Sequence, residues 1–488
     1  MNISYIISSI FKYIVPATVV MCLLSAIAGA GYFFVYKKLL KGKKTINITK
    51  VVLCILLTIY LLVVFGLTCR DRGSGIERYA NLKLFSSYID AWYTFSVRAW
   101  QFIIFNIVMF IPLGILLPLI NGVFKKVAWI FTAAFLTTLF IEGFQYLAKL
   151  GIFELDDLFH NTLGGMIGYS LFMFGYTIIK GYKKDGANNG TNIDNGINNN
   201  NNNKVGRASA VKYIILPLAV IMAFCGIFIK YNIQEFGNMP INNVTGADMS
   251  KYTIESSIDI SDKEAVAPVY KYVHSWDEDF AVSQAQKVMK DLDLPAFKSY
   301  LIQGEDIIFR FESESHGSFW WDRSNGSWRY YNHAVKKNIK DVILSDDEKY
   351  KIAMDFARNH NISLNNAVVD STTRNTITFK INSHDQEKMI SGQIVFDISY
   401  DGVVGSIRND IYENNFVRNV DIISPKSAYN KILKGNFHDW PDMPGGKIEI
   451  KDIKISYQCD TKGFYQPVYE FIGELNGEKW NAYIAAMK

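Results

Sequence analysis

The sequence predicts a membrane-embedded, all-α bundle of five spanning helices plus one anchor helix, followed by an extracellular α+β domain built of helix-plus-hairpin units. Three observations support this fold class. Hydrophobic residues make up 49% of the 488-residue chain, and the long apolar stretches all lie before residue 230. An Asn-rich tract interrupts the chain near residue 200. Beyond residue 230, short strand-like runs alternate with amphipathic helical patterns.

Six apolar stretches are long enough to span a bilayer. A helix needs about 20 residues to cross the roughly 30 Å of hydrocarbon. Five of the stretches contain no Asp, Glu, Lys or Arg, and one is interrupted only by Glu142. They are 13–36, 51–69, 99–124, 127–148, 161–179 and 213–229. The chain is therefore expected to be a multi-pass protein embedded in the lipid bilayer of the cell membrane.

The distribution of basic residues gives the expected orientation, because positively charged loops are retained in the cytoplasm. The basic loops are 37–50, 125–126 and 180–212. With alternating spans, the expected outer segments are 70–98, 149–160 and everything after residue 230. The abundance of Asn, Ile and Lys is typical of an AT-rich bacterial genome and favours a Gram-positive cell surface.

Composition divides the chain into four parts. The tract that contains Asn198 to Asn203 has no apolar periodicity that could bury a core, which predicts a flexible linker. The expected parts are a multi-span membrane domain at 1–182, an Asn-rich cytoplasmic linker at 183–210, a sixth transmembrane helix at 211–230 and an extracellular α+β domain at 231–488.

Polar side chains occur at matching depths in two of the expected spans. Asn106 lies about five residues below the outer surface, roughly 8 Å deep, and Glu142 lies at a similar depth. Gln145 lies one turn from Glu142 on the same helix face. A charged side chain in hydrocarbon costs about 2.5 to 3.5 kcal/mol on insertion scales, so Glu142 is expected to face the bundle interior. An arginine of the first outer segment, such as Arg70, is its expected partner.

Asp157 and Asn161, four residues apart at the start of the fifth span, are expected to join this set. Two interpretations of the polar residues stay open. They form either interhelical hydrogen bonds that hold the bundle together or a functional cleft that faces outward.

The two adjacent carboxylates in DDLFHNTLGG, residues 156–165, have a structural interpretation and a chemical one. Acidic residues before a helix complement its dipole and cap free N–H groups, which accounts for one of Asp156 and Asp157. The other, with His160 and Glu142, suggests a divalent metal site. Such a site needs three or four converging ligands, and nothing in the sequence fixes that convergence. We therefore expect no metal and no other cofactor.

Proline and glycine mark two close-packing features. Pro112 is expected to kink the third span and expose the carbonyl oxygen of Val108, with Gly114 continuing the irregularity. A broken spanning helix lines a cavity or is covered by protein, although proline is also frequent in ordinary spanning helices. The GGxxG pattern at 164–168 is typical of close helix packing.

Three sequence blocks carry a family resemblance. FNIVMFIPLGILLP, FIEGFQ and FELDDLFHNTLGGMIGY resemble, in order and spacing, the VanZ-like membrane domain over about residues 55 to 180. That domain is named after a protein associated with teicoplanin resistance. The resemblance implies a multi-span bacterial membrane protein whose motif residues here are Asn106, Pro112, Gly114, Glu142, Gln145, Asp157, Asn161 and Gly164. The family often has an arginine shortly before the aspartates, whereas this chain has only Lys149 there.

The C-terminal portion alternates between helices and strands. Amphipathic patterns predict helices at about 278–292, 346–359 and 425–434. Strand-like runs are DIIFRFE, TITFKIN, GQIVFDISY, KIEIKDIKISY and PVYEFIGEL, with hairpin turns at 324–326 and 476–477. SDKEAV and SDDEKYKIAMDFA suggest the starts of two repeated units. Alternate rings of the aromatic hairpin around Trp320 to Tyr331 are expected to cover a core.

The ending YQPVYEFIGELNGEKWNAYIAAM resembles the C-terminal strands of PepSY-like domains and of the YycH and YycI regulators. This resemblance implies an extracytoplasmic binding or regulatory module.

The sequence is compatible with three functions. The first is a binding and regulatory protein of the cell envelope, whose bundle engages a glycopeptide or a lipid-linked peptidoglycan precursor while its outer domain contacts a membrane or wall protein. The second is an intramembrane enzyme acting on a lipid headgroup, with Glu142 as general base and Asp157 or His160 as the second acid. Transport is third, because it requires discontinuous helices and usually paired repeats. Nucleic acid is excluded as a partner, because the net charge is only +5 and basic residues lie beside membrane segments.

Overall fold

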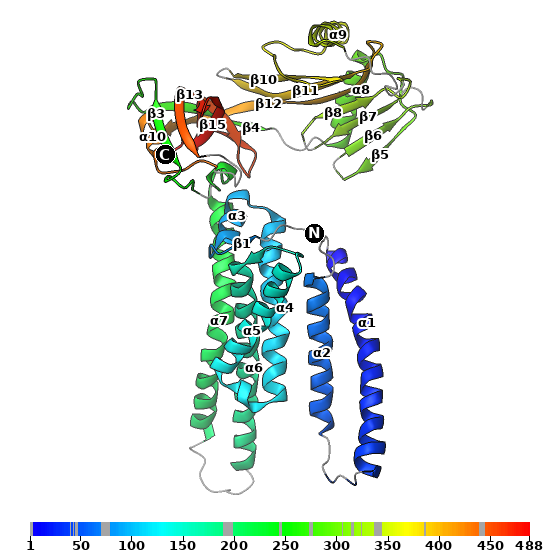
Figure 1. The fold of residues 1–488 in the computed structure, drawn as a ribbon, viewed down its shortest axis with the longest axis vertical. Coiled ribbons are helices and arrows are strands. Elements are labelled where there is room, and N and C mark those ends of the chain that lie inside the picture. The colour runs from blue at the N-terminus through cyan, green and yellow to red at the C-terminus, as the bar shows by residue number, and fades with distance from the viewer. Residues whose placement is uncertain are drawn as a thin grey trace. The chain divides into compact units, whose positions relative to one another are not determined.

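The computed structural model describes most of the chain. The described residues are 3–39, 41, 43, 47–69, 79–188, 199–243, 246–272, 277–304, 306–313, 317–323, 325–335, 344–384, 387–438 and 445–488, with the side chains of 3–10, 36, 181–188 and 199–209 left out. The chain forms two compact units, Met1–Glu235 and Phe236–Lys488. We call them the membrane unit and the sheet unit, and each is described by itself (Figure 1).

The membrane unit is a bundle of long apolar helices joined by short connections (Figure 1). Its elements are α1 Ile3–Ala30 continued by the π-helix η1 Gly31–Leu39, α2 Ile48–Cys69, β1 Ala80–Asn81, α3 Ser86–Thr94, α4 Val97–Ile120, η2 Gly122–Lys125, α5 Val127–Leu147, β2 Phe153–Glu154, α6 Leu155–Asn188 and α7 Asn199–Ile233. Among the described residues, six helices are long and apolar enough to cross a membrane. They coincide with the six apolar stretches, so the prediction of six spans is confirmed.

α7 packs into the bundle as well as leading to the sheet unit. Phe224 and Phe228 of α7 lie against a buried cluster that includes Trp100 of α4. Tyr231, near the end of α7, stacks on Phe95. The expected linker at 183–210 lies partly in α6 and α7, and its residues 189–198 fall outside the described part of the chain.

Glycines let α4 and α6 meet backbone to backbone. A Cβ atom added at Gly164 would lie 2.0 Å from the carbonyl oxygen of Ile107, and one at Gly168 would lie 2.1 Å from that of Ile111. The contact is reciprocal, because a Cβ at Gly114 would lie 2.0 Å from the carbonyl oxygen of Gly165. The close packing predicted from the GGxxG pattern is confirmed.

In its described residues, the sheet unit contains one 13-stranded sheet and three α-helices. The strand order along the main path is β3-β13-β14-β4-β12-β8-β7-β6-β5; β11 joins β12, β10 and β9 follow β11, and β15 pairs with β14. The strands are β3 Tyr252–Ser256, β4 Ala265–Tyr272, β5 Ser299–Gln303, β6 Asp306–Arg310, β7 Ser318–Asp322, β8 Trp328–Tyr331, β9 Val368–Thr372, β10 Thr376–His384, β11 Lys388–Ile398, β12 Val404–Ile422, β13 Gly446–Cys459, β14 Phe464–Leu475 and β15 Glu478–Ala485.

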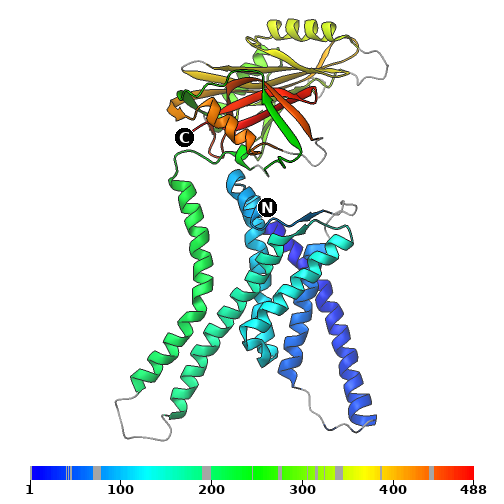
Figure 2. The same ribbon diagram turned by 60° about the vertical axis from the view of Figure 1, so that its left-hand side comes forward.

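The three helices of the sheet unit confirm the amphipathic patterns. They are α8 Glu278–Asp291, α9 Asp346–Asn359 and α10 Pro425–Leu433, and a short 3-10 turn, η3, covers Pro240–Asn242. α9 lies along one face of β10, β11 and β12 (Figure 2). The helices cover two separate apolar cores, one under α8 and α9 and one under α10. The long strand β12 belongs to both halves, because it pairs with β8 and β11 at one end and with β4 at the other.

The predicted hairpin turn at 476–477 is confirmed, whereas residue 324 of the predicted turn at 324–326 lies outside the described residues. Asn476 and Gly477 connect β14 to β15 with φ values of 53° and 89°, as a type I′ turn requires. Trp321 and Trp328 face the α8/α9 core, whereas Tyr331 is exposed, as alternation predicts. The suggested repeat is wrong, because 261–266 leads into strand β4 whereas Ser345 caps helix α9.

The start of the sheet unit is held by a buried carboxylate. Asp460, in the β13–β14 turn, accepts hydrogen bonds from the backbone N–H groups of Gly237, Lys462 and Phe464 and from Nε2 of Gln466. Asp460 is buried. Residues 236–238 are thereby fastened to the sheet directly after the membrane unit ends.

Candidate functional site

The polar residues predicted from the sequence lie near one end of the helical bundle. At this end the two expected outer segments meet, because β1 pairs in parallel with β2 and the N–H of Phe153 donates to the carbonyl oxygen of Tyr79 at 3.1 Å. α2, α4, α5 and α6 all begin or end here. We call it the β1–β2 end of the membrane unit.

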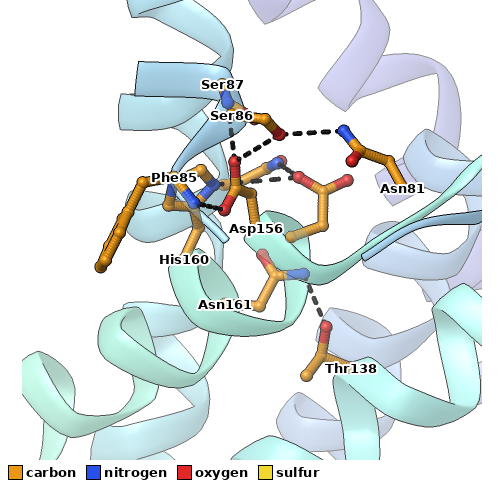
Figure 3. Close-up of polar contacts among 10 residues, drawn as sticks. Asn81, Phe85, Ser86, Ser87, Thr138, Asp156, His160 and Asn161 are labelled. Atoms are coloured by element: carbon orange, nitrogen blue, oxygen red, sulfur yellow. Dashed lines mark hydrogen bonds and ion pairs between the residues drawn. The ribbon is translucent and has the colours of Figure 1, made fainter. Parts of the chain in front are cut away.

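Asp156 organises this end rather than capping its own helix. Its carboxylate accepts hydrogen bonds from the backbone N–H of Phe85, from the N–H of Ser87 at 2.7 Å and from the hydroxyl of Ser86 at 3.2 Å (Figure 3). These donors belong to the first turn of α3, whose own N-cap residue, Phe85, makes no side-chain cap. Asp156 is buried. The structure therefore assigns Asp156 to holding α3 against α6, so the capping role expected for one of the two aspartates is not the role of Asp156.

Asp157 points to a different neighbour. Its Oδ1 accepts a hydrogen bond of 2.6 Å from Nδ2 of Asn106, so the residue pair joins α6 to α4. Nδ1 of His160 lies 3.9 Å from the same Asp157 oxygen. The Asp157 side chain is 16% exposed, whereas that of His160 is 1% exposed. Asp157 is thus the partly accessible member of a buried group.

A second set of contacts continues the polar residues toward α5 and α2. Nδ2 of Asn161 donates to the hydroxyl of Thr138 at 2.8 Å (Figure 3). Glu142 follows one turn along α5 and is buried. Nε2 of Gln145 donates to the carbonyl oxygen of Thr68, at the end of α2, at 3.1 Å. Polar side chains therefore connect four spanning helices at this end.

We call the resulting group the polar cluster. It consists of Asn106, Thr138, Glu142, Gln145, Asp157, His160 and Asn161. Arg70, the expected partner of Glu142, lies outside the described residues. Arg98, another arginine of the same expected outer segment, is exposed, and its guanidinium lies 5.5 Å from the ring centre of Phe102.

Some buried polar atoms of the cluster lack hydrogen-bond partners within the described part of the chain. Both ring nitrogens of His160 are in this state, as is Oδ1 of Asn161. Tyr88 and Phe159 contact the imidazole of His160 edge to face. Leaving a buried donor or acceptor unsatisfied costs about 1 to 3 kcal/mol, so native proteins seldom do so without a reason.

Across the described ranges, no group of three or more His, Cys, Asp or Glu side chains lies close enough to hold a metal ion. Asp156 accepts hydrogen bonds from three donors at the start of α3.

Pro112 and Gly114 lie farther along α4 from this end. α4 is one helix from Val97 to Ile120 with Pro112 inside it. The hydroxyl of Tyr60 donates to the carbonyl oxygen of Met109, three residues before the proline, at 2.9 Å. The acceptor is therefore the carbonyl oxygen of Met109 and not that of Val108, which was expected to be exposed. Gly114 serves the α4–α6 contact.

Sequence reasoning missed several contributors. Thr138 lies one helical turn before Glu142, so helical spacing alone could have added it to the set. Ser86, Ser87 and the backbone of Phe85 gave no signal, because their contact with Asp156 spans about 70 residues of sequence.

The fold and this cluster define a polytopic helical membrane domain with an acid-amide cluster near one end. Comparison with known families then identifies the domain: residues 50–178 match the model of the VanZ/LLP1 family. The membrane unit therefore contains a VanZ-like domain, over nearly the range expected from the three sequence blocks. The comparison with curated proteins found no match.

A similar solved structure matches part of this chain. It is the C-terminal domain of YpeB from Bacillus megaterium, with 14% identity, over 44% of this chain and 95% of that domain, at a TM-score of 0.21. A TM-score this low does not establish a shared arrangement of strands and helices.

Proposed function

We propose that the VanZ-like membrane unit binds an envelope ligand, a glycopeptide or a lipid-linked peptidoglycan precursor, at the polar cluster. The observation that carries the proposal is the buried imidazole of His160, whose nitrogens have no hydrogen-bond partner in the described residues. Beside it, Asp157 is partly accessible and Oδ1 of Asn161 also lacks a donor. A polar headgroup or peptide amide would supply the missing partners.

The proposal places the β1–β2 end outside the cell. The basic loops support this orientation, because Lys125 and Lys126 follow α4 at the opposite end of the bundle. The sheet unit would then also be extracellular, where we propose that it contacts a wall component or a partner protein. A link to teicoplanin resistance and a Gram-positive host belong to the same proposal.

A thermal-shift experiment tests the binding function. The full chain in detergent is heated with teicoplanin, with a lipid-linked peptidoglycan precursor, or with a divalent metal alone. We expect the glycopeptide or the precursor to raise the melting temperature of the wild type and to lose this effect in His160→Phe. Thr137→Val is the matched control, because within the described residues the Thr137 hydroxyl donates to the carbonyl of Ala133 on its own helix. Stabilisation by metal alone, or an unchanged shift in His160→Phe, contradicts the proposal.

An intramembrane enzyme is the second candidate. It is favoured by the 3.9 Å approach of His160 to Asp157, with Glu142 buried on the neighbouring helix. In this function Glu142 acts as general base on a lipid headgroup and Asp157 or His160 supplies a proton. Mass spectrometry of a precursor incubated with the purified protein decides the matter. A product formed by the wild type and absent with Glu142→Gln supports the enzyme, and an unchanged substrate with both proteins removes it.

A further inference from the structure

A cluster of tyrosines lies on one face of the sheet unit where its two halves meet. Cross-strand pairing defines it: Ser391 of β11 lies directly opposite Tyr412 of β12, and Asn414 lies directly opposite Tyr272 of β4. Paired residues point to the same side of a sheet, as do residues two apart on one strand. The shared face therefore includes both pairs.

The same face extends to a fourth strand. Tyr270, two residues before Tyr272, pairs with Tyr465 of β14. We call this set the tyrosine face. It consists of Tyr270, Tyr272, Ser391, Tyr412, Asn414 and Tyr465.

Ring contacts hold the tyrosine face together. The rings of Tyr272 and Tyr412 meet edge to face with centroids 5.8 Å apart. Tyr270 packs in the same manner against Tyr457, at 5.2 Å, and Tyr457 in turn contacts His384 at 5.1 Å. Such rigid, amphipathic rings offer large contact areas at little cost in side-chain entropy.

The tyrosine face has a buried floor and an accessible rim. Tyr270, Tyr272 and Asn414 are buried, whereas Ser391, Tyr412 and Tyr465 are only partly buried. A face of this kind can admit a ligand at its rim without unfolding the sheet.

One polar atom in the floor has no partner. Nδ2 of Asn414 donates to the carbonyl oxygen of Met389 at 3.2 Å and to the hydroxyl of Ser391 at 3.4 Å. Oδ1 of Asn414 is buried and accepts no hydrogen bond from any described residue. A donor from a ligand, direct or through a water molecule, would satisfy it.

The side chains that make up the tyrosine face carry no charge at neutral pH. Burial raises the pKa of Tyr412 to about 12, and burial likewise raises the pKa of Tyr465, so both hydroxyls remain protonated donors at neutral pH. The nearest charges are those of Asp322 and of the Arg408–Asp410 ion pair, in which Nε of Arg408 lies 2.8 Å from Oδ2 of Asp410. Aromatic rings, neutral hydroxyls and an amide oxygen suit a ligand that carries hydroxyl and amide groups on an apolar ring.

We propose that the tyrosine face binds a saccharide chain bearing N-acetyl groups. The sugar rings stack on the aromatic rings of Tyr412 and Tyr465. A hydroxyl or an amide N–H of the saccharide donates a hydrogen bond to Oδ1 of Asn414. This assignment deepens the proposed wall-contacting role of the sheet unit and rests on it.

Calorimetry on the full chain in detergent, titrated with a tetrasaccharide of N-acetylglucosamine, tests the assignment. We expect saturable binding by the wild type and a loss of affinity of about tenfold or more in Tyr412→Ala and Tyr465→Ala, since truncating an aromatic contact residue commonly has that effect. Tyr412→Phe keeps the ring and removes the hydroxyl, so it separates stacking from hydrogen bonding. Its affinity should lie between that of the wild type and that of Tyr412→Ala.

Tyr300→Ala is the matched control. Tyr300 is an exposed tyrosine of β5 whose hydroxyl bonds to Glu278, so its removal should leave the affinity unchanged. Cooperative thermal unfolding of each variant verifies its fold. Absence of binding by the wild type, or equal affinity in the wild type and all four variants, overturns the assignment. His160→Phe should bind the tetrasaccharide normally, so failure here is distinct from failure of the membrane-unit proposal.

Discussion

Different kinds of contact stabilise the inside of each of the two units of this chain. In the membrane unit, helices meet backbone to backbone at Gly114, Gly164 and Gly168, and hydrogen-bonded side chains lie between them. In the sheet unit, two apolar cores lie under the helices, and ion pairs such as Lys447 with Glu255 lie at the surface.

The difference reflects the two solvents. In lipid, burying an apolar side chain between helices gains little, because the surrounding acyl chains are as apolar as the protein, so specificity comes from close packing and polar contacts. In water, burial of apolar area is the dominant favourable term. Substitutions should therefore separate the two units by the kind of change that harms each.

The largest effect is expected at the α4–α6 contact. Gly164→Ala forces a Cβ atom toward the carbonyl oxygen of Ile107, so the helices must separate, and we expect a loss of about 3 kcal/mol in stability. Gly175→Ala, on the same helix with open space around the added atom, should be tolerated. Thermal unfolding of both variants in detergent measures the contrast. Equal melting temperatures would show that the backbone contact is not what holds these helices.

The next effects concern two buried aspartates that perform the same task in different units. Asp460→Ala leaves the N–H groups of Gly237 and Phe464 without their acceptor, and we expect the sheet unit to lose on the order of 2 kcal/mol. Asp370→Ala, at an exposed position of β9, is the control. Chemical denaturation followed by tryptophan fluorescence reports the loss. A stability equal to that of the control would contradict an anchoring role.

Asp156→Ala should have a smaller, local effect, about 1 to 2 kcal/mol, because it frees only the first turn of α3. Hydrogen exchange at the amides of Phe85 and Ser87 should accelerate. In Asp157→Ala these amides should stay protected, since Asp157 bonds to Asn106 instead. Acceleration in both variants would mean that the two carboxylates do not have separate tasks.

Thr138→Val removes the hydroxyl that accepts a hydrogen bond from Nδ2 of Asn161. We expect a loss of about 0.6 kcal/mol in stability, which is the average contribution of such a contact in a membrane protein. Thr137→Val on the same helix supplies the reference. Unfolding in mixed micelles compares the two. A difference well above 2 kcal/mol would indicate that the polar cluster resembles the core of a water-soluble protein.

The smallest effect is a pH dependence in the sheet unit. Hydrogen bonds from the backbone N–H and the hydroxyl of Ser345 lower the pKa of Glu348 below its ordinary value of 4.5. The charged Glu348 therefore stabilises the start of α9 fully above about pH 4.5, and this contribution is lost as the pH falls through the lowered pKa. Denaturation of wild type and Glu348→Gln should converge at low pH, and a constant difference at all pH values would exclude this cause.

The sequence was most informative where a signal is local. Hydropathy located all six spans, amphipathic periodicity located α8, α9 and α10, and Asn476-Gly477 marked its hairpin, because each feature depends on residues a few positions apart. Matching depth placed Asn106 beside Glu142, and Asp157 was expected to join this set, but the hydrogen bond between Asn106 and Asp157 was not predicted.

The rest depended on distant contacts. Nothing local to Asp156 indicates that α3 supplies its donors, and nothing local to Tyr272 indicates that β12 and β14 bring other tyrosines beside it. Periodicity assigns a residue to a face, but the partner of that face is chosen by the folded chain as a whole. The role of the polar cluster in ligand binding stays a prediction for the same reason.

The most direct test of the central claim is the accessibility of position 157. Asp157→Cys is placed in a chain whose 5 native cysteines are replaced by serine or alanine, and intact cells receive a membrane-impermeant thiol reagent. We expect labelling from outside, with protection when the lipid-linked precursor or glycopeptide is bound. Labelling only after the inner face of the membrane is opened would contradict an outward-facing binding site at the polar cluster.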